Sequence, residues 1–370
     1  MKILVTGASG FIGSFIVEEA LNRGEVWAGL RASSSKKYLP FSDLNFIDIP
    51  YSKRDEAVAL LREHKEKFGK WDVIIHNMGL TKCKHISDFD RVNFEYTKNF
   101  IEALMEADMV PEHFVYMSSL SAFGPGDPVS LAELKLDDEP KPDTAYGFSK
   151  LKTERYLRSL QNFPYTILRP TGVYGPREKD YFVMLQTLSR HLNPAIGFEP
   201  QFITFIYVKD LVKAIFLSVD KKAIGKEYFV ADGDVWNSDD YTKLSMKKLG
   251  VAWAVPVRVP CFLVKAIAYT LDTVCGWFGV IPTLNKDKYN ILFYKDTKYR
   301  DEYFALNLKK NSTLYRKEKP KEELLRSKHT ASIIKFHVKL NNAKKTAPRF
   351  GEQLSFISLP SVSTTYNRIP

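Results

Sequence analysis

The glycine spacing at the start of the chain constrains its fold more than any other feature. Residues 3–5 form a short apolar run typical of a buried strand, and Gly7, Gly10 and Gly13 follow at intervals of three. Apolar side chains then recur at helical spacing. The order strand, glycine turn, helix predicts a dinucleotide-binding unit. Gly7 permits a tight turn, Gly10 lets a pyrophosphate approach the backbone, and Gly13 lets helix and strand pack closely.

The helix that follows this turn offers free N–H groups and the positive end of its dipole to phosphates. A glycine-rich turn that binds no ligand is the alternative interpretation, but the strand and helix on either side favour the dinucleotide. The residues expected to contact the cofactor here are Thr6, Gly7, Ser9, Gly10, Phe11, Ile12 and Gly13.

The net charge of +11 belongs entirely to the C-terminal tail. Residues 286–370 hold 19 Lys and Arg against 8 Asp and Glu, whereas residues 1–285 hold 35 of each. The excess therefore says nothing about the rest of the chain. Because the tail has no recognisable nucleic-acid-binding module, we expect no nucleic-acid partner.

Cys83, Cys261 and Cys275 are too few and too scattered for a disulfide framework or a zinc site. We therefore expect no metal and a reducing, cytoplasmic location. The apolar run at residues 3–5 is too short for a signal peptide, and no uninterrupted run of about 18 apolar residues predicts a spanning helix. Residues 261–282 are rich in apolar side chains. They predict a core helix, or else one that lines an apolar pocket or touches a membrane surface.

Strands and helices alternate through the first half of the chain. The predicted strands are residues 25–30, 46–47, 72–76, 114–117 and 165–168, and the predicted helices are 55–68, 92–109 and 144–160. This alternation predicts an α/β fold, a doubly wound parallel (Rossmann) sheet with helices on both faces. Ligands of such sheets bind at the carboxyl ends of the strands. The polar residues expected there are Thr6, Arg31, Asp48, Asn77 and Ser119.

The chain of 370 residues is long enough for two domains. We predict an NAD(P)-binding Rossmann domain at 1–170 and a smaller substrate-binding lobe at 171–300, with 203–220 returning to the main sheet. Residues 301–370 form a basic tail of uncertain structure, compatible with a divergent or disordered C-terminus or with a frame change in the gene.

A phenol and an ammonium lie four residues apart at Tyr146 and Lys150, so they share one face of the helix predicted there. Ser119 ends a predicted strand 27 residues before Tyr146. Together the three predict a proton-transfer site. The Lys150 cation is expected to lower the tyrosine pKa, Tyr146 to exchange a proton with a substrate hydroxyl, and Ser119 to orient that oxygen.

Six stretches resemble one family. They are Thr6–Gly13, Asp72–Gly79, Ser118–Gly124, Tyr146–Lys150, Arg169–Pro176 and Phe205–Asp210. They make residues 1 to about 235 similar to extended short-chain dehydrogenases/reductases of the NAD-dependent epimerase/dehydratase family. The resemblance implies a catalytic triad of Ser119, Tyr146 and Lys150, with Lys150 also holding the nicotinamide ribose. The further cofactor contacts that it implies are Asp48 and Ile49 near the adenine, Asn77, Met78 and Gly79, and Pro170, Gly172 and Val173 beside the nicotinamide.

The end of the second strand indicates the cofactor. An acidic residue there accepts the ribose 2′-hydroxyl of NAD, whereas an arginine accommodates the 2′-phosphate of NADP. Here Arg31 follows the strand and no carboxylate comes before Asp43. We therefore favour NADP, with NAD still open. The alternative is a solvated basic loop.

The substrate is inferred from departures from family patterns. Ser119 is not followed by acidic residues, unlike in the 4,6-dehydratases. Epimerases of nucleotide sugars usually have asparagine where Gly172 stands and arginine near Ile203, both of which grip the diphosphate. The chain instead resembles the hydroxysteroid dehydrogenase and dihydroflavonol reductase side of the family. We predict reversible hydride transfer between NADP(H) and an apolar secondary alcohol or ketone. A nucleotide-sugar epimerase, a non-catalytic dinucleotide sensor or scaffold, and assembly into homodimers stay open.

Overall fold

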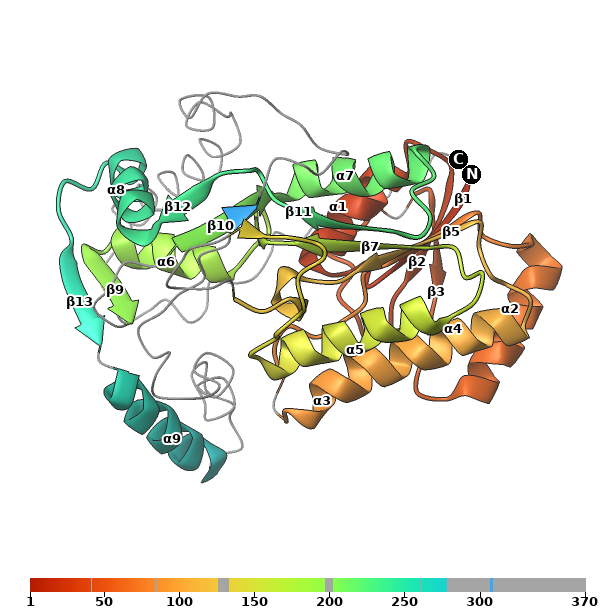
Figure 1. The fold of residues 1–370 in the computed structure, drawn as a ribbon, viewed down its shortest axis with the longest axis horizontal. Helices are drawn as coiled ribbons and strands as arrows, with labels where there is room; N and C mark the ends of the chain where they lie inside the picture. Colours follow the sequence, from red (N-terminus) through yellow and green to blue (C-terminus); the bar gives the residue numbers. More distant parts are fainter. Residues whose placement is uncertain are drawn as a thin grey trace, which may run out of the picture.

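The computed structural model describes residues 1–277, except 41, 84, 126–132, 197–201 and 260, together with 307–308. Seven parallel strands form the main sheet in the order β11-β7-β5-β4-β1-β2-β3 (Figure 1). They are β1 (Lys2–Thr6), β2 (Glu25–Gly29), β3 (Leu44–Ile47), β4 (Val73–His76), β5 (His113–Met117), β7 (Tyr165–Pro170) and β11 (Lys226–Val230). The main sheet thus has the parallel, doubly wound architecture that the alternation predicted.

Helices cover both faces of the main sheet (Figure 1). On one face lie α1 (Phe11–Ala20) and α7 (Val208–Asp220), whose apolar sides share a buried core with β1 and β2. On the other face lie α2 (Arg54–Phe68), α4 (Tyr96–Glu106) and α5 (Ala145–Ser159), which enclose a second core. Because both faces are buried, the strands read as continuous apolar runs in the sequence.

A single helix was expected at 92–109, but the structure has three consecutive helical segments that together span residues 87–106. They are α3 (Ser87–Phe89), a π-helical segment η1 (Asp90–Glu95) and α4. Such π-helical turns are rare and occur mostly as single turns within α-helices, often at functional sites. The widened turn carries Asn93, which is fully buried.

Smaller sheets lie beyond the main one. The strands β8 (Gly172–Tyr174), β10 (Phe202–Tyr207) and β12 (Val235–Asn237) pair together, and β9 (Leu192–Ile196) pairs with β13 (Val255–Val259). The expectation that 203–220 returns to the main sheet is wrong for β10 but holds for α7, which packs on it. The seventh strand is β11 instead. An apolar pattern predicts a strand without specifying its partner.

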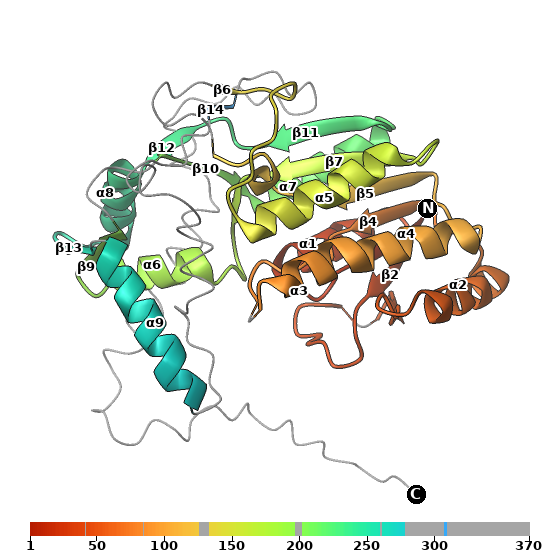
Figure 2. The same cartoon turned by 60° about the horizontal axis from the view of Figure 1, so that its bottom comes forward.

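Three further α-helices, the 3-10 helix η2 (Leu120–Ala122) and a short strand pair complete the described chain. The α-helices are α6 (Asp180–Leu188), α8 (Ser238–Leu249) and α9 (Cys261–Trp277), and in the strand pair β6 (Glu133–Leu134) is paired with β14 (Asn307–Leu308). Figure 2 shows α9 at the end of the molecule that carries α6 and α8, opposite α2.

The apolar segment 261–282 was expected to be a core helix. Helix α9 covers its first seventeen residues, and residues 278–282 lie outside the described chain. The side chains of Ile267, Leu271, Val274 and Trp277 are exposed, so this expectation is wrong for these four residues. None of the described helices is both long and apolar enough to cross a bilayer. Apart from residues 307–308, the 301–370 tail is also outside the described chain.

Candidate active site

The glycine turn between β1 and α1 has no room for side chains at two of its three glycines. Gly7 has a φ of +66°, and a Cβ on it would lie 2.7 Å from the Asn77 carbonyl oxygen. A Cβ on Gly13 would lie 2.1 Å from the Gly7 carbonyl oxygen. Gly10 is exposed and caps α1 without a side-chain hydrogen bond. The turn therefore presents bare backbone at a helix N-terminus, which suits a pyrophosphate.

Buried hydrogen bonds fix the strand ends around this turn. The Thr6 hydroxyl accepts from the Met78 backbone N–H at 3.2 Å and lies 3.0 Å from His76 Nδ1. The other nitrogen of His76 lies 3.0 Å from the Thr97 hydroxyl. Burial, with a smaller contribution from the Lys150 charge, lowers the pKa of His76 to about 3. The neutral imidazole thus joins β1, β4 and α4, a role that the sequence did not indicate.

The remaining turn residues expected at the cofactor occupy different environments. Ser9 is half-buried, while Phe11, Ile12 and Val173 are partly buried against the core that α1 shares with the sheet. Ile49 is 2% exposed and packs in the opposite core, so its side chain is not available to a ligand.

The ends of β2 and β3 bring Arg31 and Asp48 to neighbouring positions. The Asp48 carboxylate accepts a hydrogen bond from the Ala32 backbone N–H at 2.8 Å. Arg31 is exposed, and no carboxylate in the described part of the chain pairs with it. The Arg31 guanidinium is therefore available at the strand end where the second ribose of a dinucleotide would lie. The Asp48 carboxylate beside it is already hydrogen-bonded to the backbone.

Helix α5 places Tyr146 beside the end of β5. Its N-cap is Thr144, whose hydroxyl accepts from the Gly147 N–H at 3.0 Å. The hydroxyls of Tyr146 and Ser119 are hydrogen-bonded. Burial raises the pKa of Tyr146, and the bond to Ser119 offsets part of that rise. The expectation that Lys150 lowers this pKa is wrong in this structure, because desolvation dominates.

Lys150 is 4% exposed and lies one turn further along α5. Its ammonium donates a hydrogen bond to the Met117 carbonyl at 2.9 Å and lies 5.0 Å from the centre of the Tyr116 ring. Burial lowers the pKa of Lys150 to about 8, and the negative charge of Glu154 opposes this shift. The structure thus brings Ser119, Tyr146 and Lys150 together at one edge of the main sheet.

Asn93, in the π-helical segment, is a site residue that sequence reasoning missed. Its amide oxygen accepts from the Leu80 N–H at 2.7 Å, and its amide nitrogen donates to the Leu80 carbonyl at 3.1 Å and to Ser149 Oγ at 3.0 Å. A Cβ on Gly79 would lie 3.0 Å from this amide oxygen and 3.2 Å from the Lys150 ammonium. The loop after β4 is thereby held against Lys150.

The turn after β7 leads into an aromatic cluster formed by Tyr174, Tyr181, Phe205, Tyr207 and Tyr241. The Phe205 ring centre lies 5.2 Å from those of Tyr181 and Tyr241. A Cβ on Gly172 would lie 2.4 Å from the Tyr181 hydroxyl and 3.2 Å from the Phe205 ring. The aromatic cluster therefore fills the space into which a side chain at position 172 would project.

Three polar atoms near this turn are buried without a partner among the described residues. They are Thr171 Oγ1, Thr204 Oγ1 and Asp232 Oδ2. Burial raises the pKa of Asp232 to about 7. Asp232 follows β11 at the carboxyl edge of the main sheet, and strand position alone could have identified it.

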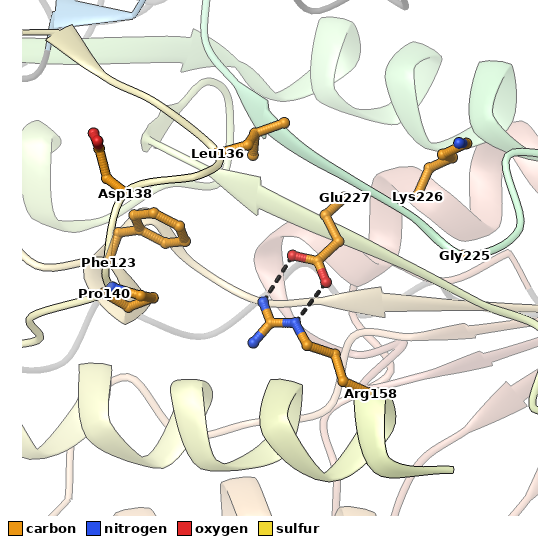
Figure 3. A pocket seen from close by; sticks show the side chains of 8 residues that line it. All are labelled: Phe123, Leu136, Asp138, Pro140, Arg158, Gly225, Lys226 and Glu227. Atoms are coloured by element: carbon orange, nitrogen blue, oxygen red, sulfur yellow. Dashed lines mark hydrogen bonds and ion pairs between the residues drawn. The ribbon is translucent and has the colours of Figure 1, made fainter. Parts of the chain in front are cut away.

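A surface pocket lies along the outer edge of the main sheet, where β11 runs beside the last turn of α5 (Figure 3). Its lining residues are Phe123, Leu136, Asp138, Pro140, Arg158, Gly225, Lys226 and Glu227. None of the residues predicted to bind cofactor or to act in catalysis lines it. The pocket is therefore separate from the candidate active site.

Comparison with known proteins agrees with this geometry. A profile of the NAD dependent epimerase/dehydratase family matches residues 3–231. An ADP-L-glycero-D-manno-heptose-6-epimerase of Alkalilimnicola ehrlichii is 32% identical over 187 residues, which are 48% of this chain. The match spans only 54% of that relative's length.

Solved structures share the fold. The UDP-glucuronic acid 4-epimerase of Bacillus cereus, in complex with UDP-glucuronic acid and NAD, has a TM-score of 0.65 at 21% identity, covering 91% of this chain and all of that one. A dTDP-glucose 4,6-dehydratase of Streptomyces venezuelae has a TM-score of 0.66 at 18% identity, covering 93% of this chain and 98% of that one. The resemblance seen in the sequence is confirmed: the chain belongs to the NAD-dependent epimerase/dehydratase family.

Proposed function

We propose that this enzyme transfers a hydride reversibly between a nicotinamide cofactor and a secondary alcohol or ketone, with Tyr146 as the general acid and base. The observation that carries the proposal is the hydrogen-bonded pair of Tyr146 and Ser119 beside the buried Lys150. The bare glycine turn fits a dinucleotide, since Gly10 is open and Gly7 and Gly13 leave no competing side chains. The nicotinamide, when bound, supplies or accepts the hydride.

The chain's own residues handle the proton. Because the pKa of Tyr146 is raised, its phenol is protonated at neutral pH and is ready to donate to a carbonyl oxygen. Ser119 orients that oxygen, and Lys150 supplies positive charge as the phenolate forms. In the opposite direction the phenolate takes the proton of the substrate hydroxyl.

We assign NADP as the preferred cofactor. The support is the exposed guanidinium of Arg31, which pairs with no carboxylate among the described residues. The neighbouring Asp48 carboxylate already accepts a hydrogen bond from the Ala32 backbone N–H. We also assign Asn77, Met78 and Gly79, and the turn of Pro170, Gly172 and Val173, to the cofactor. The division into a cofactor domain (1–170) and a substrate-binding lobe (171–300) is part of the same proposal, as is a cytoplasmic location, which rests on the scattered cysteines.

The substrate proposed is an apolar alcohol or ketone. Its support is the aromatic cluster, since the Tyr181 hydroxyl occupies the place of a side chain at Gly172. An amide there could grip a diphosphate, whereas five aromatic rings favour a ligand with apolar surface.

The second candidate is a nucleotide-sugar epimerase, which the similarity to the heptose epimerase favours. An epimerase returns its hydride to the same substrate and gives no net change in nicotinamide absorbance. The test first measures the thermal shift that two ligand classes cause, apolar ketones with NADPH in one case and UDP- and ADP-sugars in the other. It then follows the absorbance of the nicotinamide during the reaction. A ligand at 100 times its dissociation constant stabilises the fold by about 2.7 kcal/mol, so the true class should be visible.

We expect stoichiometric NADPH oxidation with a ketone. Stabilisation by a nucleotide sugar, with product formed and no net NADPH change, would establish the epimerase instead. Cofactor binding with no turnover in either class would favour the sensor or scaffold.

A further inference from the structure

A fully buried carboxylate, Glu154, lies one helical turn beyond Lys150 on α5. It accepts two hydrogen bonds from the Arg169 guanidinium, each 2.8 Å long, from Nε and Nη2. It accepts others from the Ser118 hydroxyl and, at 3.1 Å, from Arg158 Nη2. A carboxylate removed from water in this way is retained only when it is fully hydrogen-bonded, as Glu154 is.

The partners of Glu154 are the chain neighbours of the candidate active site. Ser118 directly precedes Ser119 at the end of β5, and Arg169 directly precedes Pro170 at the end of β7. Glu154 itself is four residues from Lys150 and eight from Tyr146, so all three lie on one face of α5. One carboxylate thus joins the three elements that hold the triad and the turn beside it.

Glu154 is also the anion that acts on Lys150. The groups that face the Lys150 ammonium are Glu154 from α5, the Met117 carbonyl and the Tyr116 ring from β5, His76 from β4, and Asn93 from η1. Among these described groups only Glu154 carries a negative charge at neutral pH, and His76 is neutral because of its low pKa. Removing Glu154 would leave the buried ammonium with the carbonyl as its main support.

Glu227, on β11, offers a matched control. It accepts from both Arg158 Nε and Nη2 at 2.7 Å, and also from Arg169 Nη2. Figure 3 shows the Arg158–Glu227 pair in the surface pocket at the sheet edge. Glu227 therefore shares the two arginines with Glu154, but it lies on the edge strand β11 and not on the helix that carries Tyr146 and Lys150.

We infer that Glu154 is a positioning residue of the active site, which aligns Ser119, Tyr146 and Lys150 through Ser118 and Arg169 and holds the Lys150 side chain in its charged form. The inference rests on the proposed function only in taking these three as the catalytic residues. It concerns no particular substrate.

The test compares Glu154→Gln with Glu227→Gln. The Lys150 ammonium is titrated by NMR of ¹³Cε-labelled lysine, assigned with Lys150→Arg. We expect Glu154→Gln to lower the pKa of Lys150 by about one unit, because the charged form loses its anionic neighbour, and to move the alkaline limb of the kcat profile to lower pH. Glu227→Gln should lower thermal stability but leave the Lys150 titration unchanged.

An unchanged Lys150 titration in Glu154→Gln, or an equal shift in both variants, would reduce Glu154 to a structural ion pair and overturn the inference. If Glu154→Gln does not fold, the double variant Glu154→Gln/Arg169→Gln removes both buried charges together. The pKa of Lys150 should still fall, because the charge that acts on its ammonium is that of Glu154 and not that of Arg169. The NMR readout needs no substrate. A wrong assignment of the reaction would therefore show as absent turnover with the titration shift intact.

Discussion

Alanine at Gly13 should unfold the dinucleotide turn before any ligand is added. The new Cβ would lie 2.1 Å from the Gly7 carbonyl oxygen and 2.9 Å from Ala8 Cα, both backbone atoms of the turn itself. No side-chain rotation can relieve these contacts, so α1 must move away from β1. Overpacking costs about 1–3 kcal/mol in well-packed sites, and contacts this short place Gly13→Ala near the upper end. For a folded part of this size, a loss of about 3 kcal/mol corresponds to a fall of roughly 5 °C in melting temperature.

Gly10→Ala is the matched control. Its Cβ would be 3.3 Å from the Gly7 oxygen, a close contact that a shift of a few tenths of an ångström relieves, and the position is exposed with an extended backbone. The weaker N-cap and the stiffer unfolded chain roughly cancel, so the ligand-free stability should change by less than about 1 kcal/mol. The methyl group would instead stand where the pyrophosphate approaches. We expect at least a tenfold weaker affinity for NADPH, about 1.4 kcal/mol.

Thermal unfolding without ligand and calorimetric titration with NADPH separate the two effects. Gly13→Ala should lose stability without ligand, whereas Gly10→Ala should lose mainly affinity. A Gly13→Ala protein that melts at the wild-type temperature would refute the close-packing argument. Wild-type NADPH affinity in Gly10→Ala would show that the cofactor phosphates bind elsewhere.

Three further predictions concern the catalytic tyrosine, the choice of cofactor and the buried histidines. Tyr146→Phe should reduce turnover by about 10²–10⁴-fold in steady-state assays, because the phenol moves the proton, while the NADPH dissociation constant stays close to that of the wild type. Retained activity would show that Tyr146 is not the general acid and base. Arg31→Asp should change the ratio of NADP to NAD affinity by tenfold or more in favour of NAD, since a carboxylate repels the 2′-phosphate and accepts a hydrogen bond from the 2′-hydroxyl. Titration of both cofactors into both proteins measures this ratio, and tighter binding of NAD by the wild type would contradict the assignment of Arg31. Acid should destabilise the fold below pH 6.5, because burial lowers the pKa of His64 and His113 to about 4 and of His76 to about 3. The unfolded chain then binds more protons between these values and 6.5, so the free energy of unfolding falls as the pH falls through this window; denaturant midpoints at pH 7.5, 6 and 5 measure it.

The sequence predicted the main sheet because its signals are local. The turn at Gly7, Gly10 and Gly13 requires its strand and helix by sterics, and a Cβ at Gly13 would overlap the Gly7 carbonyl in the structure. Tyr146 and Lys150 lie on one turn of α5 because four-residue spacing fixes their face. These features need no knowledge of distant partners.

Features that depend on distant partners escaped prediction. The pKa of Tyr146 depends on how much surface the neighbouring elements remove from water, which spacing cannot reveal. The widened helical turn at Asn93 is closed by bonds to Leu80 and Ser149, from a loop and from another helix. Likewise, the apolar pattern of β10 predicts a strand, but the pattern does not say that this strand pairs with β8 and β12 and not with the main sheet.

The choice of substrate rests on the least local of these features. Tyr181, on α6, puts its hydroxyl where a side chain at Gly172 would project, and α6 begins six residues after β8 ends. Phe205 of β10 and Tyr241 of α8 pack on the same side, so three separate elements shape this wall. The three proton-transfer residues, in contrast, lie on α5 and at the end of β5. Residues of 171–249 can therefore change what is bound without disturbing how the proton moves, and substitutions at Tyr181 or Tyr241 should alter KM and substrate preference before they alter the pH dependence set by Tyr146 and Lys150.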